Sequence, residues 1–533
     1  MVKKTIKPAK EETLETILFN CRNSLRGRAA MTDKRDLLLT LVFLKFIGER
    51  FKDQQEKIRE DLKQQGIDDE GFIEMQLKRP QRYLQDGVFF LSEETFWDNL
   101  ILTPSTGMAV AFDTAIKMLD DNEPKLKNAL PQQIFTKTQL EPGVLKGVVY
   151  EIEKIDPKRF VEHDLIGRVY EYFLQAFSIN ADKEEGEFYT PHSIVELIAS
   201  IIEPFDGTVY DPCCGSGGMF VQATKFIEAH GGNTQAVNVY GQESEPATYR
   251  LAKMNLAIRG IACNLGEMAA DTFHNDQHKD LKADFIMANP PFNQKAWRAE
   301  NELKDDPRWA GYDVPPTNNA NYGWILNIVS KLSANGTAGF LLANGALSGD
   351  GTELKIRKKL LQNHIVEAIV ILPRNMFYST DISVTLWILN NNKKARTVEQ
   401  NGQMVKYRNR EDEVLFIDLR QWGEPFEKKY IQFSTEQIQK IAENFHNWQR
   451  VGYEQSYHNE PEYCYSATLD EIEKKGWSLV PSKYIEFRNR DEQIDFDTKM
   501  RQLQADMRDL LQQEEESKQQ LKDLFERLGY KMN

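Results

Sequence analysis

The fold of this chain is decided by the segment Thr208-Val209-Tyr210-Asp211-Pro212-Cys213-Cys214-Gly215-Ser216-Gly217-Gly218. Its first residues favour a β-strand, its last residues are rich in glycine, and an apolar stretch from Met219 to Ala229 follows it. This order predicts a strand, a tight loop and a helix. Glycines in such a loop let the backbone approach a ligand closely, and the helix presents its first amides to that ligand.

The composition of the loop favours a cationic ligand without phosphate. The loop has one G-x-G step, whereas pyrophosphate-binding loops usually have G-x-G-x-x-G, and Asp211 at the strand end would repel phosphate. A second predicted strand, Val237 to Tyr240, leads to Glu243, at the position that binds ribose hydroxyls in Rossmann-like folds. Asp271 follows a third predicted strand end and is expected to reach an adenine. S-adenosylmethionine meets these requirements; the alternative is that both acids are solvated loop residues.

The tetrapeptide Asn289-Pro290-Pro291-Phe292 follows the apolar run Asp284 to Ala288 and predicts chemistry at an amino nitrogen. The lone pair of an amine on a planar ring is delocalised, so two carbonyl acceptors, the Asn289 side chain and the Pro290 main chain, would localise it by each accepting one N–H. Proline has no N–H to compete, and Phe292 offers a flat face on which a ring stacks. The alternative is a structural Pro-Pro turn that closes a buried strand.

These motifs resemble the modification (M) subunits of type I restriction-modification systems, which are adenine-N6 DNA methyltransferases. The resemblance covers Glu187 to His192, Asp211 to Gly218, Glu243, Asn289 to Phe292, and Leu372 to Phe377 with the strand-like residues after it. It implies a Rossmann-like α/β methyltransferase core and methyl transfer from S-adenosylmethionine to adenine N6 in double-stranded DNA. It further implies that Asn289 to Phe292 hold the base and that the cofactor is bound by Ser216, Gly217, Gly218, Glu243 and the segment Glu187, Phe188, Tyr189, Thr190, Pro191 and His192. Cys213 and Cys214 stand where small residues such as alanine are common, and cysteine is small enough to keep the mechanism.

Length and composition predict an intracellular protein of several domains. The 533 residues exceed what one core usually supports, and 41% hydrophobic residues argue against general disorder. The five cysteines form neither C-x-x-C pairs nor a His/Cys cluster, so we expect no metal site, no disulfide framework and a cytoplasmic location. No apolar segment follows the basic N-terminus, and the strongest apolar run, Leu37 to Ile47, is too short to span a bilayer. We therefore expect no secretory signal and no membrane anchor.

The net charge of −14 indicates that the chain does not grip DNA alone, because affinity for DNA comes mainly from Lys and Arg. The resemblance implies a separate specificity (S) subunit that reads the sequence, and further a second M copy and a restriction (R) subunit. Candidate DNA contacts in this chain are basic residues beyond the catalytic turn, for which a solvated surface is the alternative: Lys295, Arg298, Arg308, Lys355, Arg357, Lys358 and Lys359. No Walker motif is present, so nucleotide hydrolysis is not expected of this chain.

Three domains are predicted from the order of these features: a helical assembly domain at 1–155, a methyltransferase domain at 156–475 and a helical tail at 476–533. Apolar spacing predicts N-terminal helices over Glu11 to Leu25, Asp33 to Asp53, Gln54 to Gln65 and Val144 to Ile155. The alternative to cofactor binding for Phe188 to Pro191 is a hydrophobic staple and N-cap before the helix Ser193 to Ile201, with Thr190 as cap and Pro191 at the first position, and both roles are compatible. Strands Ile365 to Leu372 and Ser383 to Leu389 are placed by resemblance at an antiparallel sheet edge.

Two further segments, Pro307 to Asn321 and the C-terminal tail, contain no predicted catalytic or cofactor-binding residue. Pro307 to Asn321 is rich in Pro, Asn and Asp and is either a lid or a surface excursion; Trp297 and Trp309 beside it either cover a base or anchor the segment. In the tail, six apolar residues follow a heptad-like pattern with spacings of three and four, interrupted in the middle by Glu514 and Ser517: Met500, Leu503, Met507, Leu510, Leu521 and Leu524. The stripe predicts docking on the S subunit, or else packing on this chain's own helices.

Other activities stay open at this point. A protein or RNA N-methyltransferase would use the same Asn-Pro-Pro turn on another planar amine. A cofactor-binding scaffold without activity is the non-enzymatic alternative, and the intact Asn289 to Phe292 turn argues against it.

Overall fold

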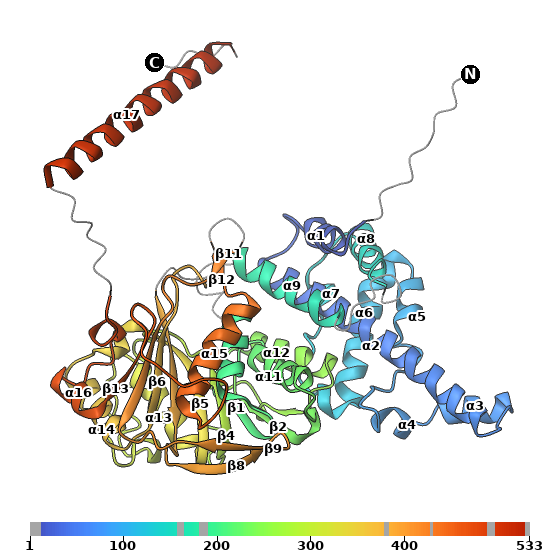
Figure 1. Ribbon diagram of the computed structural model, residues 1–533. Coiled ribbons are helices and arrows are strands. Elements are labelled where there is room, and N and C mark those ends of the chain that lie inside the picture. Colours follow the sequence, from blue (N-terminus) through green and yellow to red (C-terminus); the bar gives the residue numbers. More distant parts are fainter. Residues whose placement is uncertain are drawn as a thin grey trace. The chain divides into compact units, whose positions relative to one another are not determined.

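A computed structural model describes residues 12–156, 165–180, 190–377, 383–426, 430–487 and 496–527 of the chain. Two compact units are present, Met1–Ile485 and Glu486–Asn533. Figure 1 shows the order of the elements along the chain. No helix in the described segments is both long and apolar enough to cross a bilayer.

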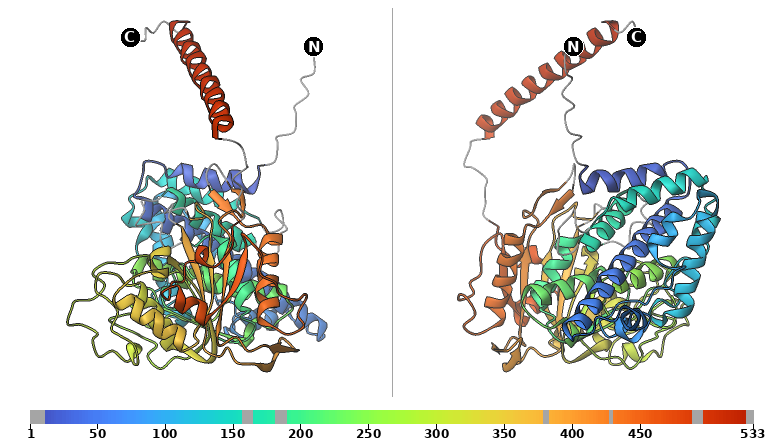
Figure 2. Two further views of the ribbon diagram at one scale, coloured as in Figure 1. Left: turned by 60° about the vertical axis from the view of Figure 1, so that its left-hand side comes forward. Right: turned by 90° about the vertical axis from the view of Figure 1, so that its right-hand side faces the viewer.

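The first part of the larger unit is a bundle of helices. Its elements are α1 (Leu14–Ser24), α2 (Met31–Gln64), α3 (Glu70–Leu77), α4 (Gln81–Leu84), α5 (Trp97–Leu102), α6 (Ser105–Asn122), η1 (Pro124–Leu126), α7 (Ile134–Lys137), α8 (Pro142–Glu153) and α9 (Leu165–Asn180). The predicted helices Asp33 to Asp53 and Gln54 to Gln65 are one continuous helix, because the polar residues between them are good helix formers. Helix α2 packs against α9, and the two run side by side in the right-hand view of Figure 2.

The second part of the larger unit is a nine-stranded sheet with the order β13-β10-β6-β7-β5-β4-β1-β2-β3. Its strands are β1 (Gly207–Asp211), β2 (Val237–Gly241), β3 (Cys263–Asn264), β4 (Ala283–Ala288), β5 (Leu332–Ala343), β6 (Val366–Ile371), β7 (Val384–Asn390), β10 (Glu413–Asp418) and β13 (Cys464–Thr468). Strands β3, β2, β1, β4 and β5 pair in parallel, and β7 runs antiparallel to both β5 and β6.

The predicted antiparallel pair therefore does not form the edge of the sheet. Strand β7 lies between β5 and β6, and β10 extends the sheet beyond β6 in parallel. Strand β13 then pairs antiparallel with β10 and ends the sheet. These two strands were not predicted because their pairing joins residues far apart in sequence. Two short hairpins stand apart from the sheet: β8 (Arg396–Gln400) with β9 (Gln403–Tyr407), and β11 (Glu424–Phe426) with β12 (Tyr430–Gln432).

Both faces of the sheet are covered by helices, as the alternation of strand side chains requires. Ile286 and Ala288 of β4 belong to one core, and Met287 between them belongs to the other. The first core holds α13 (Asn321–Lys331) and α14 (Thr352–Gln362), and the second holds α10 (His192–Ile202), α11 (Gly218–Ala229) and α15 (Thr435–Gln449). The mixed α/β architecture with a helical region before it and a helix after it agrees with the predicted fold class.

The predicted tail divides at residue 485. Tyr484 stacks on Phe416 with ring centroids 4.2 Å apart, and Leu479 donates its N–H to the Leu347 carbonyl. Residues 476–485 thus pack with the larger unit. The boundary between the two units therefore lies after Ile485, whereas the predicted tail began at 476. The smaller unit contains α17 (Phe496–Arg527), whose predicted stripe residues are all exposed, with exposed fractions between 39% and 61%.

Candidate active site

The carboxyl ends of β1, β2 and β4 surround one cavity of about 640 Å³. The predicted residues that line it are Thr190, His192, Asp211, Gly215, Ser216, Gly218, Glu243, Asp271, Asn289, Pro290, Pro291 and Phe292. Pro191 lines a neighbouring groove instead, and Gly217 is the N-cap residue of α11. Glu187, Phe188 and Tyr189 lie outside the described residues.

The loop between β1 and α11 has a shape that glycine permits. Gly215 has a φ of 54° and Gly217 a φ of 80°, values that other residues rarely adopt. A Cβ on Gly217 would also lie 3.3 Å from Leu256 Cγ. The side chain of Asn255 donates to the Ser216 carbonyl at 2.7 Å, which fixes the loop to helix α12 (Pro246–Ile258).

Glu243 lies at the end of β2 and faces this loop. One carboxylate oxygen accepts the Gly215 N–H at 3.0 Å, and the other accepts the Glu245 N–H at 2.8 Å. Burial raises the pKa of the Glu243 carboxyl, and backbone hydrogen bonds oppose this change. A partly buried carboxylate of this kind is suited to accept hydrogen bonds from a pair of hydroxyls.

Asp211 is the second buried acid of the cavity, and only 1% of its surface is exposed. It accepts the Cys213 N–H at 3.0 Å. The pKa of Asp211 is raised to about 7, mainly by burial and to a smaller extent by the charge of Glu243, while hydrogen bonds from Cys213 oppose the change. The cavity therefore gains negative charge as the pH rises through neutrality.

This titration predicts a pH-dependent affinity for S-adenosylmethionine. Asp211 is mostly neutral at pH 6 and mostly charged at pH 7.5, and a cationic ligand favours the charged form, so the affinity should rise roughly fivefold to tenfold over that interval. Isothermal titration calorimetry at several pH values measures this slope. Asp211→Asn should flatten it, whereas a slope that is equally steep in the variant would exclude Asp211 as the titrating group.

Asp271 has a structural role beside its place in the cavity. Its Oδ1 accepts the N–H groups of Phe273 and His274 at 2.8 and 2.9 Å, and it also contacts His274 Nδ1 at 3.0 Å. The turn after β3 is thereby held at the rim of the cavity. The predicted contact of Asp271 with an adenine stays a prediction.

The Asn289 side chain is oriented by a hydrogen bond and leaves its oxygen unused. Its Nδ2 donates to the Thr190 hydroxyl at 3.0 Å, while its Oδ1 is buried and has no hydrogen-bond partner among the described residues. The prediction that Thr190 caps α10 is wrong: that helix begins at His192, with Pro191 in the capping position and no side-chain cap. The Thr190 hydroxyl instead sets the direction of the Asn289 amide.

Phe292 has an aromatic partner in the segment that follows β6. Phe292 meets Phe377 edge to face, with ring centroids 5.9 Å apart and an interplanar angle of 83°. Phe377 also lines the cavity, so a flat ring bound beside Asn289 would have an aromatic wall.

Two of the cavity residues that were not identified from the sequence carry a buried polar atom without a partner in the described part of the chain. These atoms are Gln294 Oε1 and Trp324 Nε1. Gln294 lies two residues after Phe292, and this closeness to the predicted turn is a signal that could have pointed to it. Trp324 lies on α13, and no local pattern distinguishes it from a core tryptophan.

The segment Pro307 to Asn321 is tied to the core by arginines. Arg298 donates to the Pro315 carbonyl at 2.6 Å, and Arg308 donates to the Thr272 and Phe273 carbonyls at 2.8 and 2.6 Å. Trp297 and Trp309 are buried and anchor the segment, as one of the two alternatives predicted. A lid function for the segment stays a prediction.

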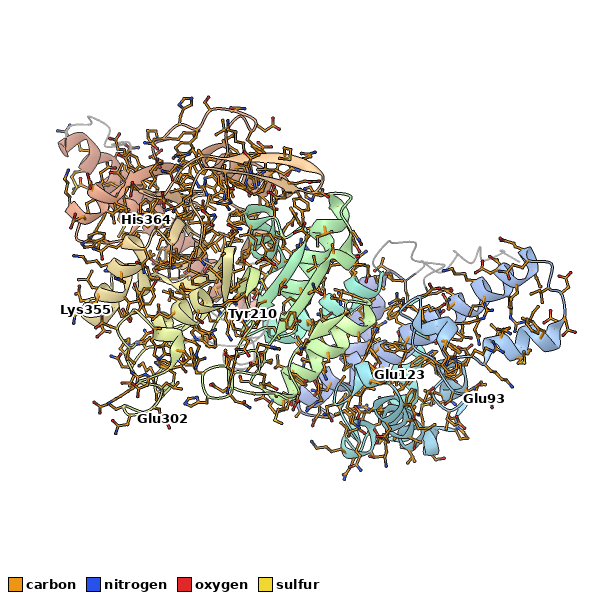
Figure 3. All side chains as sticks on the ribbon, turned by 90° about the horizontal axis from the view of Figure 1, so that it is seen from below. Glu93, Glu123, Tyr210, Glu302, Lys355 and His364 are labelled. Atoms are coloured by element: carbon orange, nitrogen blue, oxygen red, sulfur yellow. The ribbon has the colours of Figure 1, made fainter. Side chains whose placement is uncertain are left out.

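Several candidate DNA contacts are therefore internal. Arg357 donates to the Trp477 and Gly349 carbonyls. The guanidinium groups of Arg298, Arg308 and Arg357 therefore all bind backbone carbonyls within the fold. DNA contact and a solvated surface were the two alternatives predicted for these arginines, and the internal role was missed because their carbonyl partners are distant in sequence or not marked by any local pattern. Lys295, Lys355 and Lys359 are exposed, and Lys358 is half-buried; Lys355 lies at the periphery of the molecule in Figure 3.

Comparisons with known proteins identify the family of the chain. Residues 161–493 match the family model of the N-6 DNA Methylase, and residues 14–152 match the HsdM N-terminal domain. The Type I restriction enzyme MjaIX methylase subunit of Methanocaldococcus jannaschii is 33% identical, over 97% of this chain and 91% of the relative. The Type I restriction enzyme HindI methylase subunit of Haemophilus influenzae is 38% identical, over 80% of this chain and 94% of the relative.

A solved structure shows the same fold. The type I restriction-modification system methyltransferase subunit from Streptococcus thermophilus has a TM-score of 0.71 at 22% identity, covering 88% of this chain and 98% of its own. With two domain models in sequence order and relatives matched over nearly their whole length, the chain belongs to the N-6 DNA methylases and, within them, to the methylase subunits of type I restriction enzymes.

Proposed function

We propose that this methylase uses S-adenosylmethionine to methylate the N6 amino group of an adenine turned out of double-stranded DNA, with Asn289 to Phe292 as the catalytic turn. The observation that carries the proposal is the buried Asn289 Oδ1, which has no hydrogen-bond partner among the described residues and lies in the cavity that also contains the glycine loop and Glu243. A buried acceptor without a partner is costly, and such groups persist where a ligand satisfies them.

The catalytic turn accepts hydrogen bonds from the adenine amino group and removes no proton before methyl transfer; the nitrogen loses its surplus proton after it has gained the methyl group. Asn289 Oδ1 and the Pro290 carbonyl would each accept one N–H of the adenine amino group, which draws its lone pair out of conjugation. The Thr190 hydroxyl keeps the Asn289 amide from turning its N–H₂ toward the base. Phe292 and Phe377 would hold the ring plane so that the lone pair keeps a fixed direction.

The charge of the cavity fits S-adenosylmethionine. Its sulfonium supplies an electrophilic methyl group, and its positive charges suit a cavity lined by Asp211 and Glu243. We assign Glu243 to the ribose hydroxyls, the loop Gly215 to Gly218 to the amino-acid end of the cofactor, and Asp271 to its adenine. Among the described residues no group of His, Cys, Asp and Glu side chains is placed to bind a metal ion.

Replacement of Glu243 tests this assignment. Glu243→Gln should weaken S-adenosylmethionine binding about tenfold, and Glu243→Ala by a hundredfold or more, since hydrogen bonds to a charged group contribute roughly 1.5–3 kcal/mol each. Calorimetric titration gives both affinities. Glu267→Gln is the matched control, because Glu267 is exposed and does not line the cavity. Unchanged affinity in Glu243→Ala would contradict the assignment.

The acidic chain is proposed to act within a larger complex. The S subunit would read the DNA sequence and dock α17, and a second M copy and an R subunit would complete the restriction enzyme. The exposed apolar stripe of α17 and the net charge of −14 support a partner that supplies both helices and basic residues.

A transfer assay distinguishes the substrate classes. The chain, purified with the subunits that accompany it, should transfer tritiated methyl groups to DNA that lacks N6-methyladenine, and the label should be recovered as N6-methyladenine after digestion. Transfer to RNA or protein instead, or no transfer at all, would favour one of the alternatives and overturn the proposal.

A further inference from the structure

One wall of the cofactor cavity comes from the helical domain. Thr32 and Arg35 of α2, and Glu171 and Leu174 of α9, line the same cavity as Ser216, Gly218 and Glu243. Arg35 is 6% exposed although it carries a full charge. Thr32 and Arg35 are three positions apart on α2, so they lie on the same face of the helix.

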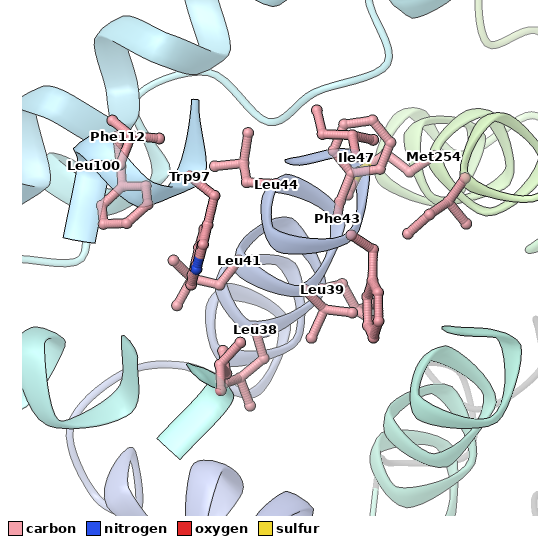
Figure 4. Packing of buried hydrophobic residues seen from close by; sticks show 14 of the residues in the cluster. Leu38, Leu39, Leu41, Phe43, Leu44, Ile47, Trp97, Leu100, Phe112 and Met254 are labelled. Atoms are coloured by element: carbon pink, nitrogen blue, oxygen red, sulfur yellow. The ribbon is translucent and has the colours of Figure 1, made fainter. Parts of the chain in front are cut away.

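This wall is held firmly against the catalytic domain. Met254 of α12 is part of the hydrophobic core of the helical bundle, and Figure 4 shows it beside Ile47 and Phe43 of α2. Arg50 of α2 donates to the Ile258 carbonyl at 3.0 Å, and Lys253 of α12 donates to the Lys127 carbonyl at 2.8 Å. Because Asn255 of α12 also donates to the Ser216 carbonyl, α12 connects the helical bundle to the glycine loop.

The charges around the cavity are unevenly distributed. The cavity-lining residues in the described segments include five carboxylates, Glu171, Asp211, Glu243, Glu245 and Asp271, and only one lysine or arginine, Arg35. Glu171 is paired with Lys225 at 3.1 Å and Arg259 at 3.4 Å. A cofactor with a sulfonium, an ammonium and a carboxylate finds anions for its positive groups in this cavity, and its carboxylate has one candidate counter-ion.

We infer that Arg35 of the helical domain binds the carboxylate of S-adenosylmethionine, so that the helical domain completes the cofactor site. The guanidinium is oriented for this by its Nε, which donates to Asp36 at 2.9 Å. Arg35 also lies in the second turn of a helix that starts at Met31 with no side-chain cap, and the positive end of that helix favours an anion. The inference rests on the proposed use of S-adenosylmethionine.

The inference has a consequence for assembly. A helical domain that contributes a charged cofactor contact couples cofactor binding to the position of α2. Binding of S-adenosylmethionine would then stabilise the packing of the helical bundle against α12. The gain would equal the free energy that Arg35 contributes to cofactor binding.

The test compares two ligands that differ only in the carboxylate. The full-length wild-type chain should bind S-adenosylmethionine about 10- to 100-fold more tightly than decarboxylated S-adenosylmethionine, because only the carboxylate can accept charge-assisted hydrogen bonds from the guanidinium. In Arg35→Gln the affinity for S-adenosylmethionine should fall by that factor, and the affinity for the decarboxylated ligand should stay equal or rise. Arg35→Lys keeps the positive charge and should retain part of the selectivity.

The outcomes separate the two proposals. Equal loss of affinity for both ligands in Arg35→Gln, or equal selectivity in Arg35→Gln and Arg35→Lys, would overturn the role of Arg35 and leave the proposed cofactor intact. Failure of the wild-type chain to bind either ligand would overturn the cofactor itself. Arg28→Gln is the matched control, since Arg28 is exposed in the same domain and does not line the cavity. Thermal melting of each unliganded variant checks that it folds; if Arg35→Gln does not, the comparison of wild type with Arg35→Lys decides.

Discussion

Asn289→Ala is expected to lower the rate of methyl transfer on the order of a hundred- to a thousandfold while cofactor affinity changes little. The variant loses the buried Oδ1 acceptor, which has no other partner in the described residues and contributes only when the target amine is present. Loss of one preorganised hydrogen-bonding group at a reacting centre typically has an effect of this size. Removal of an interaction that forms mainly in the transition state lowers kcat more than it changes KM.

Single-turnover transfer of labelled methyl groups to unmethylated DNA measures the effect in the assembled complex. Asn301→Ala is the matched control, because Asn301 is exposed and its side chain contacts only Lys304 in the described segments. Thr190→Val keeps the acceptor but removes the hydroxyl that orients it, so an intermediate loss is expected. Full activity in Asn289→Ala would remove the catalytic turn from the mechanism.

The sequence was sufficient for the parts of the fold that are set locally. The strand, glycine loop and helix around Gly215 and Gly217 follow from residues adjacent in sequence, and so does β4 before Asn289. Strands β10 and β13 were not predicted, because their pairing depends on partners across the sheet. The same limit applies to the domain boundary: α12 belongs to the catalytic part by sequence order, yet its Met254 is buried in the helical core.

The candidate site divides in the same way. Asn289 and Glu243 stand in motifs whose residue types reveal their chemistry, and the fold brings both into one cavity. Arg35 and Trp324 line that cavity from helices that carry no motif, so only the packing of the chain identifies them. Arg298 and Arg357 show the opposite error, since a basic residue on a polar segment is predicted at the surface and here satisfies buried carbonyls.

Helix α17 is expected to be required for assembly and dispensable for cofactor binding. Its apolar stripe is exposed, and burial of each such side chain against a partner helix contributes on the order of 1.5–3 kcal/mol. The double substitution Leu503→Glu with Leu510→Glu would place two charges in the apolar stripe and should abolish complex formation. Cofactor affinity should stay at the wild-type value, because the cavity residues all belong to the unit that ends at Ile485.

A matched variant separates loss of the seam from added charge. Ala505→Glu with Gln512→Glu introduces the same two charges at the same seven-residue spacing, on the outward face of the heptad pattern. Co-purification with the other subunits, followed by size-exclusion chromatography, should show an intact complex for this control and a free methylase subunit for the stripe variant. An intact complex in both variants would mean that the partner binds the methylase through the larger unit. The apolar stripe of α17 would then not be the binding site for that partner.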